Sequence, residues 1–198
     1  MELDLEYIEG QTPLDEDEKE GLLIPTIATR SELDEFEQQN IEQAMLWSLE
    51  RSMKQESIFS EKFIRVVHKH MFNQVWVWAG EFRKTNKNIG VDKWQIPIEV
   101  RVLLDDVNFW ISNKSYSPDE IAIRFKHRLV SIHCFSNGNG RHSRLMADII
   151  IDKVFKLPIF TWGTSNLVKH GNIRAIYIAG LKDADNGNIL PLLKFARL

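Results

Sequence analysis

Apolar side chains recur every three or four positions over several stretches of this chain, which is the spacing of a helix that buries one face. The pattern is clearest on both sides of residues 133–144. Before this segment the apolar positions at helical spacing are Ile121, Phe125, Leu129 and Ile132. After it the same spacing resumes and continues to residue 154. The sequence therefore predicts two buried helices joined by a short loop.

Capping residues indicate where the other helices begin. A hydroxyl or carboxylate side chain just before an apolar-periodic run accepts hydrogen bonds from the first turn, and proline is favoured at the first helical position. These signals predict helices that begin after Thr29, Ser60 and Ser117 and at Pro97. The helix after Thr29 is predicted to reach about residue 53.

The N-terminal part contains one further start and stop signal. Thr12 and Pro13 precede a run of acidic residues, which predicts a short acidic helix. Gly21 ends it, and Pro25 prevents its continuation. A solvated surface helix is the simplest interpretation of this segment.

Residues 81–96 are the stretch with the weakest helical pattern. Weak alternation around Gly90 predicts a two-stranded hairpin formed by residues 85–91 and 93–96. An isolated hairpin is marginally stable, so we expect it to be mobile. An ordinary connecting loop is the alternative. The predicted fold class is thus an all-α helical bundle with one small β-hairpin.

The loop at residues 133–144 carries the clearest chemistry. A helix start exposes unpaired N–H groups and the positive end of the helix dipole, so it is an anion site. Gly138 and Gly140 allow a phosphate to approach the backbone, and Arg141 and Arg144 supply donor forks for further phosphate oxygens. His133 can accept a proton at neutral pH. This combination indicates group transfer from a polyphosphate.

Each of these residues also has a purely structural interpretation. Two glycines between helices often form no more than a turn. Arg144 has a possible ion-pair partner in Asp148 one turn on, and Arg141 fits a solvated helix face. A histidine at a helix end often serves only as a cap. The function class therefore depends on the joint pattern.

Composition restricts the class of protein. The chain has 198 residues, of which 43% are hydrophobic, enough for one globular domain covering residues 1–198. A formal net charge of −3 makes nucleic acid an unexpected partner. No apolar run approaches the roughly 18 residues of a membrane span. The acidic first residues lack the features of a secretory signal, and Cys134 is the single cysteine, so we expect a cytoplasmic protein.

The loop motif resembles the signature of the Fic family, His-x-Phe-x-acidic-Gly-Asn-Gly-Arg-x-x-Arg. The residues that match are His133, Phe135, Gly138, Asn139, Gly140, Arg141 and Arg144. The resemblance implies transfer of AMP from ATP to a protein hydroxyl, with His133 as general base and Phe135 as anchor of the loop. It implies that the nucleotide is bound by Gly138, Asn139, Gly140, Arg141 and Arg144. In the related Doc-like kinases a lysine stands where this chain has Gly140, so the glycine favours nucleotidyl transfer.

The chain departs from the family motif at Asn137, where the family has the acidic residue that carries magnesium. Mg²⁺ prefers charged oxygen ligands, and the Asn137 amide is neutral. We therefore expect weak Mg²⁺ binding. This departure keeps open a non-catalytic nucleotide-binding or toxin–antitoxin regulatory module. Removal of AMP, or transfer of another phosphate-linked group, is the alternative within the enzyme class.

The resemblance extends along the whole chain. It implies that residues 81–96 are the family's flap, an edge that docks an extended target segment by strand pairing. The flap residues concerned are Thr85, Asn86, Lys87, Asn88 and Ile89. Residues 12–24 resemble the family's N-terminal inhibitory segment, with Glu20 as the inhibitory carboxylate that reaches Arg144. The chain is most similar to the group called mobile mystery protein B, which implies a helix-turn-helix companion protein. The sequence does not indicate an oligomeric state.

Overall fold

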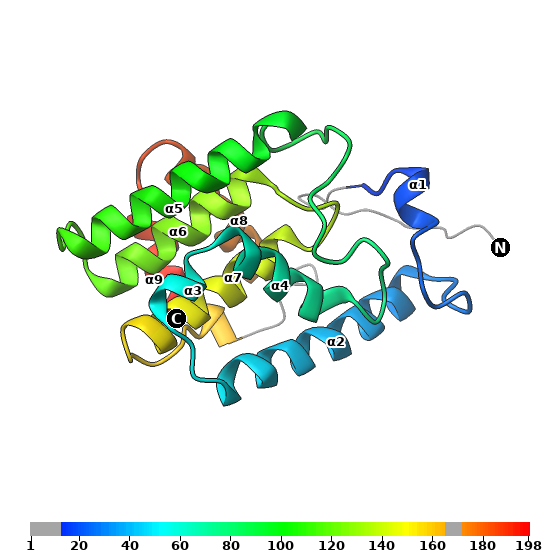
Figure 1. Ribbon diagram of the computed structural model, residues 1–198, viewed down its shortest axis with the longest axis horizontal. Coiled ribbons are helices and arrows are strands. Elements are labelled where there is room, and N and C mark those ends of the chain that lie inside the picture. The colour runs from blue at the N-terminus through cyan, green and yellow to red at the C-terminus, as the bar shows by residue number, and fades with distance from the viewer. Residues whose placement is uncertain (1–12, 165–171) are drawn as a thin grey trace.

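The computed structural model describes residues 13–164 and 172–198, which are almost entirely helices and loops (Figure 1). The α-helices are α1 (Glu16–Lys19), α2 (Arg30–Glu50), α3 (Gln55–Ile58), α4 (Glu61–Phe72), α5 (Ile96–Ser112), α6 (Pro118–Ile132), α7 (Asn139–Ile149), α8 (Asn172–Asp185) and α9 (Leu190–Ala196). Short 3₁₀ turns occupy Lys93–Gln95 and Trp162–Thr164, and a π-helical turn, Ile150–Val154, extends α7. The helical bundle that the sequence predicted is confirmed.

Helix α7 lies in the interior of the bundle (Figure 1). It contacts α2, α4 and α6, while α5 packs on the outer side of α6 and α9 packs on α8. The buried apolar side chains of these helices form one hydrophobic core. The N-terminus of α7, where the loop of residues 133–138 arrives, is thereby held in place by three other helices. In the described ranges, no helix is both long and apolar enough to cross a bilayer.

The predicted helix starts are confirmed where a side chain caps the first turn. The hydroxyls of Thr29, Ser60 and Ser117 each accept a hydrogen bond from the backbone N–H three residues on. At the start of α2, Glu32 returns the bond to the Thr29 amide at 3.0 Å, which completes a capping box. Local sequence therefore determines where these helices begin.

The N-terminal acidic helix is shorter than predicted. Helix α1 begins at Glu16, three residues later than the expected start at Pro13, and Thr12 lies outside the described residues. The physical reason is a nearer cap. The Asp15 amide donates to the Glu18 carboxylate at 2.8 Å, which closes the first turn around Asp15.

Main-chain bonds then attach this segment to the loop after α4. The Leu23 amide donates to the Val75 carbonyl and the Val77 amide donates to the Gly21 carbonyl, both at 2.9 Å. Glycine is required at position 21, because a Cβ there would lie 2.7 Å from the Trp78 ring. The position of α1 is therefore set by residues far along the chain.

The predicted β-hairpin is not formed. Within the described residues there is no strand, and residues 81–92 run as bends and irregular chain before the 3₁₀ turn at 93–95. The carbonyls that strand pairing would use are taken by one side chain. The Arg83 guanidinium donates to the Thr85 carbonyl at 2.8 Å and also to the Val91 carbonyl. We refer to residues 81–96 as the flap loop.

Candidate active site

A cavity of about 560 Å³ opens where the 133–138 loop, the flap loop, α2 and α8 meet. This volume is typical of a small-molecule site. His133 and Gly140 line it from the loop and α7, Gly90 lines it from the flap loop, Arg30 from α2 and Tyr177 from α8. The structure thus brings together segments that the sequence separates by more than a hundred positions.

His133 ends α6 in the left-handed conformation, with φ 58° and ψ 61°. This turn directs the chain away from the helix and places the histidine at the cavity. The flap loop holds it there, because Arg83 Nε donates to the His133 carbonyl at 2.7 Å. Gly90 packs so closely that a Cβ at that position would lie 2.5 Å from the His133 Cβ. The sequence prediction that His133 belongs to this site agrees with its position.

The His133 imidazole is neutral at physiological pH. Burial lowers its pKa to about 4, and the positive charges of Arg83 and Lys87 act in the same direction. A neutral imidazole is able to accept a proton from a hydroxyl. An anionic ligand in the cavity would raise this pKa, since opposite charge favours the imidazolium.

Phe135 anchors the loop, as the sequence predicted. Its ring is fully buried and stacks on the imidazole of His68, with centroids 3.7 Å apart and an interplanar angle of 17°. The His142 ring meets it edge-on at 5.0 Å. The Asn139 side chain closes the loop, accepting from the Phe135 amide at 2.9 Å and donating to its carbonyl at 2.7 Å. Asn139 therefore shapes the loop of residues 133–138 with its side chain.

His68 braces the loop from α4, a role that the sequence did not reveal. Its Nδ1 accepts from the Gly80 amide at 3.0 Å, so Nε2 carries the proton and donates to the Asn137 carbonyl at 3.1 Å. Burial lowers the pKa of His68 well below its ordinary value, which keeps the ring neutral. The only signal in the sequence was a histidine inside an apolar helical run.

Two glycines at the N-terminus of α7 allow close approach of other atoms to the backbone. Gly138 has φ 77°, and a Cβ there would lie 2.3 Å from the Phe72 ring, so this position requires glycine. Gly140 differs, because no described atom beyond its own helix lies within 4 Å of where its Cβ would be. It also lines the cavity. The first turn of α7 is therefore open at Gly140, which allows an anion to approach the helix N-terminus closely.

Two arginines of α7 line the cavity in different surroundings. The Arg144 guanidinium carbon lies 5.4 Å from the centre of the Tyr177 ring, and no ion pair joins Arg144 to Asp148 among the described residues. Arg141 Nη1 lies 2.7 Å from the Glu37 carboxylate of α2, whose side chain is fully buried. The sequence indicated Arg141 as a phosphate ligand but gave no sign of its partner Glu37.

Asn137 lines the cavity, but its side-chain oxygen accepts a hydrogen bond from the Gly138 amide at 2.7 Å. It thereby stabilises the loop. Among the described residues, no cluster of three or more His, Cys, Asp or Glu is placed to hold a metal ion. The Asn137 amide oxygen is neutral, and a neutral oxygen is a weaker ligand for Mg²⁺ than a carboxylate.

The prediction that Glu20 reaches Arg144 is wrong. Glu20 is exposed, and within the described part of the chain it neither lines the cavity nor forms an ion pair with Arg144. The reason is the register of α1. The bonds that attach Gly21 to the loop after α4 turn position 20 outward, and the buried carboxylate on this turn is Glu18.

The flap residues named from the sequence do not all face one way. Ile89 lines the cavity and Asn88 is exposed. The Asn86 side chain is used within the loop, since it donates to the Asp92 carboxylate at 2.7 Å. Thr85 and Lys87 contact α1. The sequence did not indicate the role of Arg83 in this loop. The only signal was a long cationic side chain seven residues before Gly90.

The site combines three features: a buried neutral histidine, an open helix N-terminus and a cavity lined by arginines. Together they define a helical protein with an anion site suited to group transfer. Residues 58–151 match the model described as Fic/DOC family. These residues include the loop motif and the helices on both sides of it, so the family resemblance of the loop motif is confirmed for this segment.

Relatives of this domain include named enzymes. A protein adenylyltransferase Fic of Aedes aegypti is 27% identical over 138 residues, which are 68% of this chain and 26% of the mosquito protein. The one of Nematostella vectensis is 26% identical over 145 residues, 72% of this chain and 32% of that protein. The chain thus spans about a quarter to a third of the length of these relatives.

Solved structures show the same fold. The BepC protein of Bartonella tribocorum with bound AMPPNP superposes with a TM-score of 0.69 at 18% identity, covering 92% of this chain and 97% of that one. Fic-1 of C. elegans gives a TM-score of 0.66 at 22% identity, covering 90% and 51%. At such identities the likeness concerns the fold alone.

Proposed function

We propose that this protein transfers AMP from ATP to a hydroxyl side chain of another protein. One observation carries the proposal: a buried, neutral His133 stands at the edge of a cavity in which the first turn of α7 is bare at Gly140. A base and an anion site within one pocket are the parts that this reaction needs. Relatives named as adenylyltransferases support the same assignment.

In the proposed reaction His133 removes the proton from the target hydroxyl, whose oxygen attacks the α phosphorus of ATP. The new bond joins that oxygen to the α phosphorus, and the bond between the α phosphorus and the bridging oxygen breaks. Pyrophosphate leaves with the electron pair. The N–H groups at the start of α7 and the Arg144 guanidinium stabilise the negative charge that develops.

Arg141 is less available to phosphate than Arg144, because it forms an ion pair with Glu37. Its pairing with the buried Glu37 holds the guanidinium at the cavity wall and neutralises part of its charge. Arg144 has no such carboxylate among the described residues and lies over the Tyr177 ring. We therefore assign the larger share of phosphate charge stabilisation to Arg144 and the α7 amides.

The flap loop would present the target segment beside His133. Its inner side is already bonded to the active-site backbone, since the Arg83 amide donates to the Cys134 carbonyl at 2.9 Å and the Val91 amide to the Ile132 carbonyl at 3.3 Å. We propose that an extended target segment pairs its main chain with the outer side of the flap loop, away from the active-site backbone. Asn88 is exposed on this loop.

We further propose a helix-turn-helix companion protein, which the sequence resemblance to the group called mobile mystery protein B implies. A toxin–antitoxin regulatory module is the non-catalytic alternative, motivated by Asn137 in place of the family's acidic residue. Magnesium, where it takes part, would be held mainly by phosphate oxygens and water, because Asn137 offers at most a neutral oxygen. Co-purification of the two proteins from a shared expression host tests the companion.

The experiment that tests the proposed function is incubation of pure protein with ATP labelled at the α phosphate and a cell lysate, followed by mass spectrometry of the modified proteins. His133→Ala should lower transfer by roughly 10² to 10⁴ while nucleotide binding is retained, because the base acts on the hydroxyl. His70→Ala is the matched control, since His70 stacks on Trp47 outside the cavity. Equal transfer by wild type and His133→Ala would remove His133 from the mechanism. ATP binding without transfer by the wild type would favour the non-catalytic module.

A further inference from the structure

Lys126 lies in the core of the bundle, although lysine side chains usually reach solvent. It belongs to α6, seven residues before His133, and seven residues are nearly two helical turns, so the two residues share one face of the helix. Lys126 has no exposed surface, and no described atom accepts a hydrogen bond of normal geometry from its ammonium. Because a buried charge without a partner is costly, this lysine needs an explanation.

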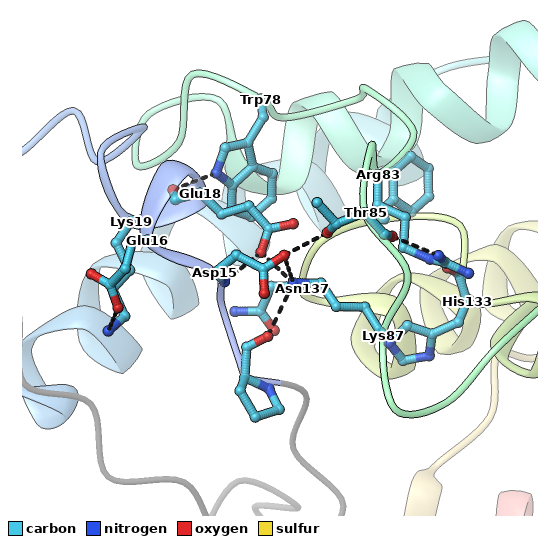
Figure 2. A network of polar contacts seen from close by, with 12 residues as sticks. Asp15, Glu16, Glu18, Lys19, Trp78, Arg83, Thr85, Lys87, His133 and Asn137 are labelled. Atoms are coloured by element: carbon cyan, nitrogen blue, oxygen red, sulfur yellow. Dashed lines mark hydrogen bonds and ion pairs between the residues drawn. The ribbon is translucent and has the colours of Figure 1, made fainter. Parts of the chain in front are cut away.

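The enclosed lysine of the flap loop shows the usual compensation. The Lys87 side chain is 3% exposed, and its ammonium lies 2.9 Å from the Asp15 carboxylate and 2.5 Å from the Glu18 carboxylate (Figure 2). Two negative charges thus surround that positive charge. Lys126 forms no ion pair with a carboxylate in the described part of the chain. The interior beside α6 therefore holds an excess positive charge.

Tyr177 separates this charge from the cavity. Its ring lines the cavity from α8 and packs on Phe195 of α9, with centroids 5.5 Å apart. Lys126 Nζ lies 4.5 Å from the centre of the Tyr177 ring, and the Arg144 guanidinium carbon lies 5.4 Å from it. Arg144 lines the cavity, whereas Lys126 does not. Two cations therefore share one ring, one at the cavity surface and one behind its wall.

The acids in this region do not neutralise the two cations. Asp185 is 61% exposed and is already paired with His127 at 2.8 Å. Asp148 lies one turn after Arg144, but burial raises its pKa to about 7, so it carries only part of a negative charge at neutral pH. The positive charge of Lys126 and Arg144 is therefore left for a ligand to balance.

The two cations also affect the ionisation of the groups around them. Burial lowers the pKa of Lys126; Tyr177 opposes this shift, and the charge of Arg144 adds to it. Burial raises the pKa of Tyr177, but the charges of Lys126 and Arg144 together lower it by more. An anion beside Arg144 would favour the charged form of Lys126, since opposite charges attract. We call the region formed by Lys126, Tyr177 and Arg144 the Lys126 corner.

We propose that Lys126 is a positioning residue that determines how strongly the cavity prefers a nucleoside triphosphate to a monophosphate. Its charge acts from behind Tyr177, across a medium of low dielectric constant, on the terminal phosphates that lie beside Arg144. The chain tolerates the buried charge because the polyphosphate balances it on binding. This inference deepens the proposed function and rests on it, but nucleotide preference can be measured without any transfer reaction.

The test compares ATP with AMP in calorimetric titrations of the wild type and Lys126→Met, since methionine keeps most of the side-chain volume and removes the charge. The Kd for ATP should rise at least tenfold, and the Kd for AMP should stay within twofold, because AMP lacks the terminal phosphates. Equal rises for both nucleotides, or no rise for ATP, would overturn the proposal. Lys153→Met is the matched control: Lys153 is 11% exposed, pairs with Asp152 at 2.8 Å and does not line the cavity, so both Kd values should stay unchanged.

Two more variants separate charge from shape. Lys126→Gln keeps a polar side chain beside Tyr177 but no charge, so it should lose the preference for ATP as the methionine variant does. Lys126→Arg keeps the charge, so its ratio of the two Kd values should lie within threefold of the wild-type ratio. A glutamine variant with the wild-type ratio, or an arginine variant without it, would show that the charge is not the cause.

Stability without nucleotide separates a positioning role from a structural one. Lys126→Met should unfold at a higher urea concentration than the wild type, because it no longer buries a charge without a partner. Lys153→Met should unfold at a lower concentration, because Lys153 donates to the Leu49 carbonyl at 2.9 Å. A Lys126→Met protein less stable than the wild type would mean that this lysine supports the fold, and would refute the proposal.

The proposed function can fail without this inference, and the reverse also holds. A wild type that prefers ATP through Lys126 but transfers no AMP would support the Lys126 corner and count against the proposed function alone. Transfer by Lys126→Met at an unchanged KM for ATP would refute the role of Lys126 and leave the proposed function intact.

Discussion

Acid should destabilise this protein by protonating the buried histidines around the loop of residues 133–138. Substitution of His142 measures the contribution of one of them. The His142 ring is fully buried, donates to the Ile64 carbonyl at 2.9 Å and has a pKa lowered by burial to about 4. The ordinary value is 6.5, which applies to the unfolded chain. Below pH 6.5 the unfolded state therefore binds the proton more tightly than the folded state, and folding stability falls as the pH falls towards 4.

The size of the effect follows from these two values. Between pH 7.5 and pH 5 the difference in proton binding lowers the free energy of unfolding by about 2 kcal/mol for one such histidine. His133 has the same pKa of about 4 and adds a similar amount. The sum of about 4 kcal/mol is large beside the 5–15 kcal/mol that typically separates folded and unfolded states.

The perturbation is His142→Gln, since glutamine keeps an N–H donor for the Ile64 carbonyl and does not titrate. Urea unfolding is measured for both proteins at pH 7.5 and pH 5. The variant should start less stable, because the edge-on contact with Phe135 is lost, but it should lose about 2 kcal/mol less than the wild type on acidification.

Taking the difference between the two proteins at both pH values cancels every titrating group that they share. His70→Gln is the control: His70 is only partly buried, so its removal should change the pH dependence much less. Equal pH dependence for wild type and His142→Gln would refute the argument that burial keeps this ring neutral.

Three other substitutions test single features of the site. Gly90→Ala should lower transfer at least tenfold with little change in ATP affinity, because φ is 94° and the new methyl would lie 2.5 Å from the His133 Cβ; unchanged turnover contradicts this packing. Asn137→Asp should strengthen Mg²⁺ binding by the nucleotide complex in calorimetric titration, and equal affinities would show that the side chain does not reach the ion. Burial raises the pKa of Asp148 to about 7, so stability should fall as the pH rises from 4 to 7 through this group. Asp148→Asn should remove that part of the pH dependence in urea unfolding, and an unaltered dependence would contradict it.

Local sequence determined the helices and the loop motif of this protein. Helix starts at Thr29, Ser60 and Ser117 follow from a side chain and the backbone amide three residues on, an interaction that the sequence alone specifies. The order of residues from His133 to Arg144 likewise identified the loop and the helix after it, because their spacing is local.

Tertiary structure alone decided which partner each of these residues has. The Arg83 guanidinium donates hydrogen bonds to carbonyls that a hairpin would need for strand pairing. Arg141 forms an ion pair with the buried Glu37 on α2. On α1 the carboxylate that meets the flap is Glu18 and not Glu20, since main-chain bonds to the loop after α4 set the register. The Glu18–Lys87 and Arg141–Glu37 contacts join residues about 70 and about 100 positions apart, and their energies depend on burial and orientation, which no local spacing encodes.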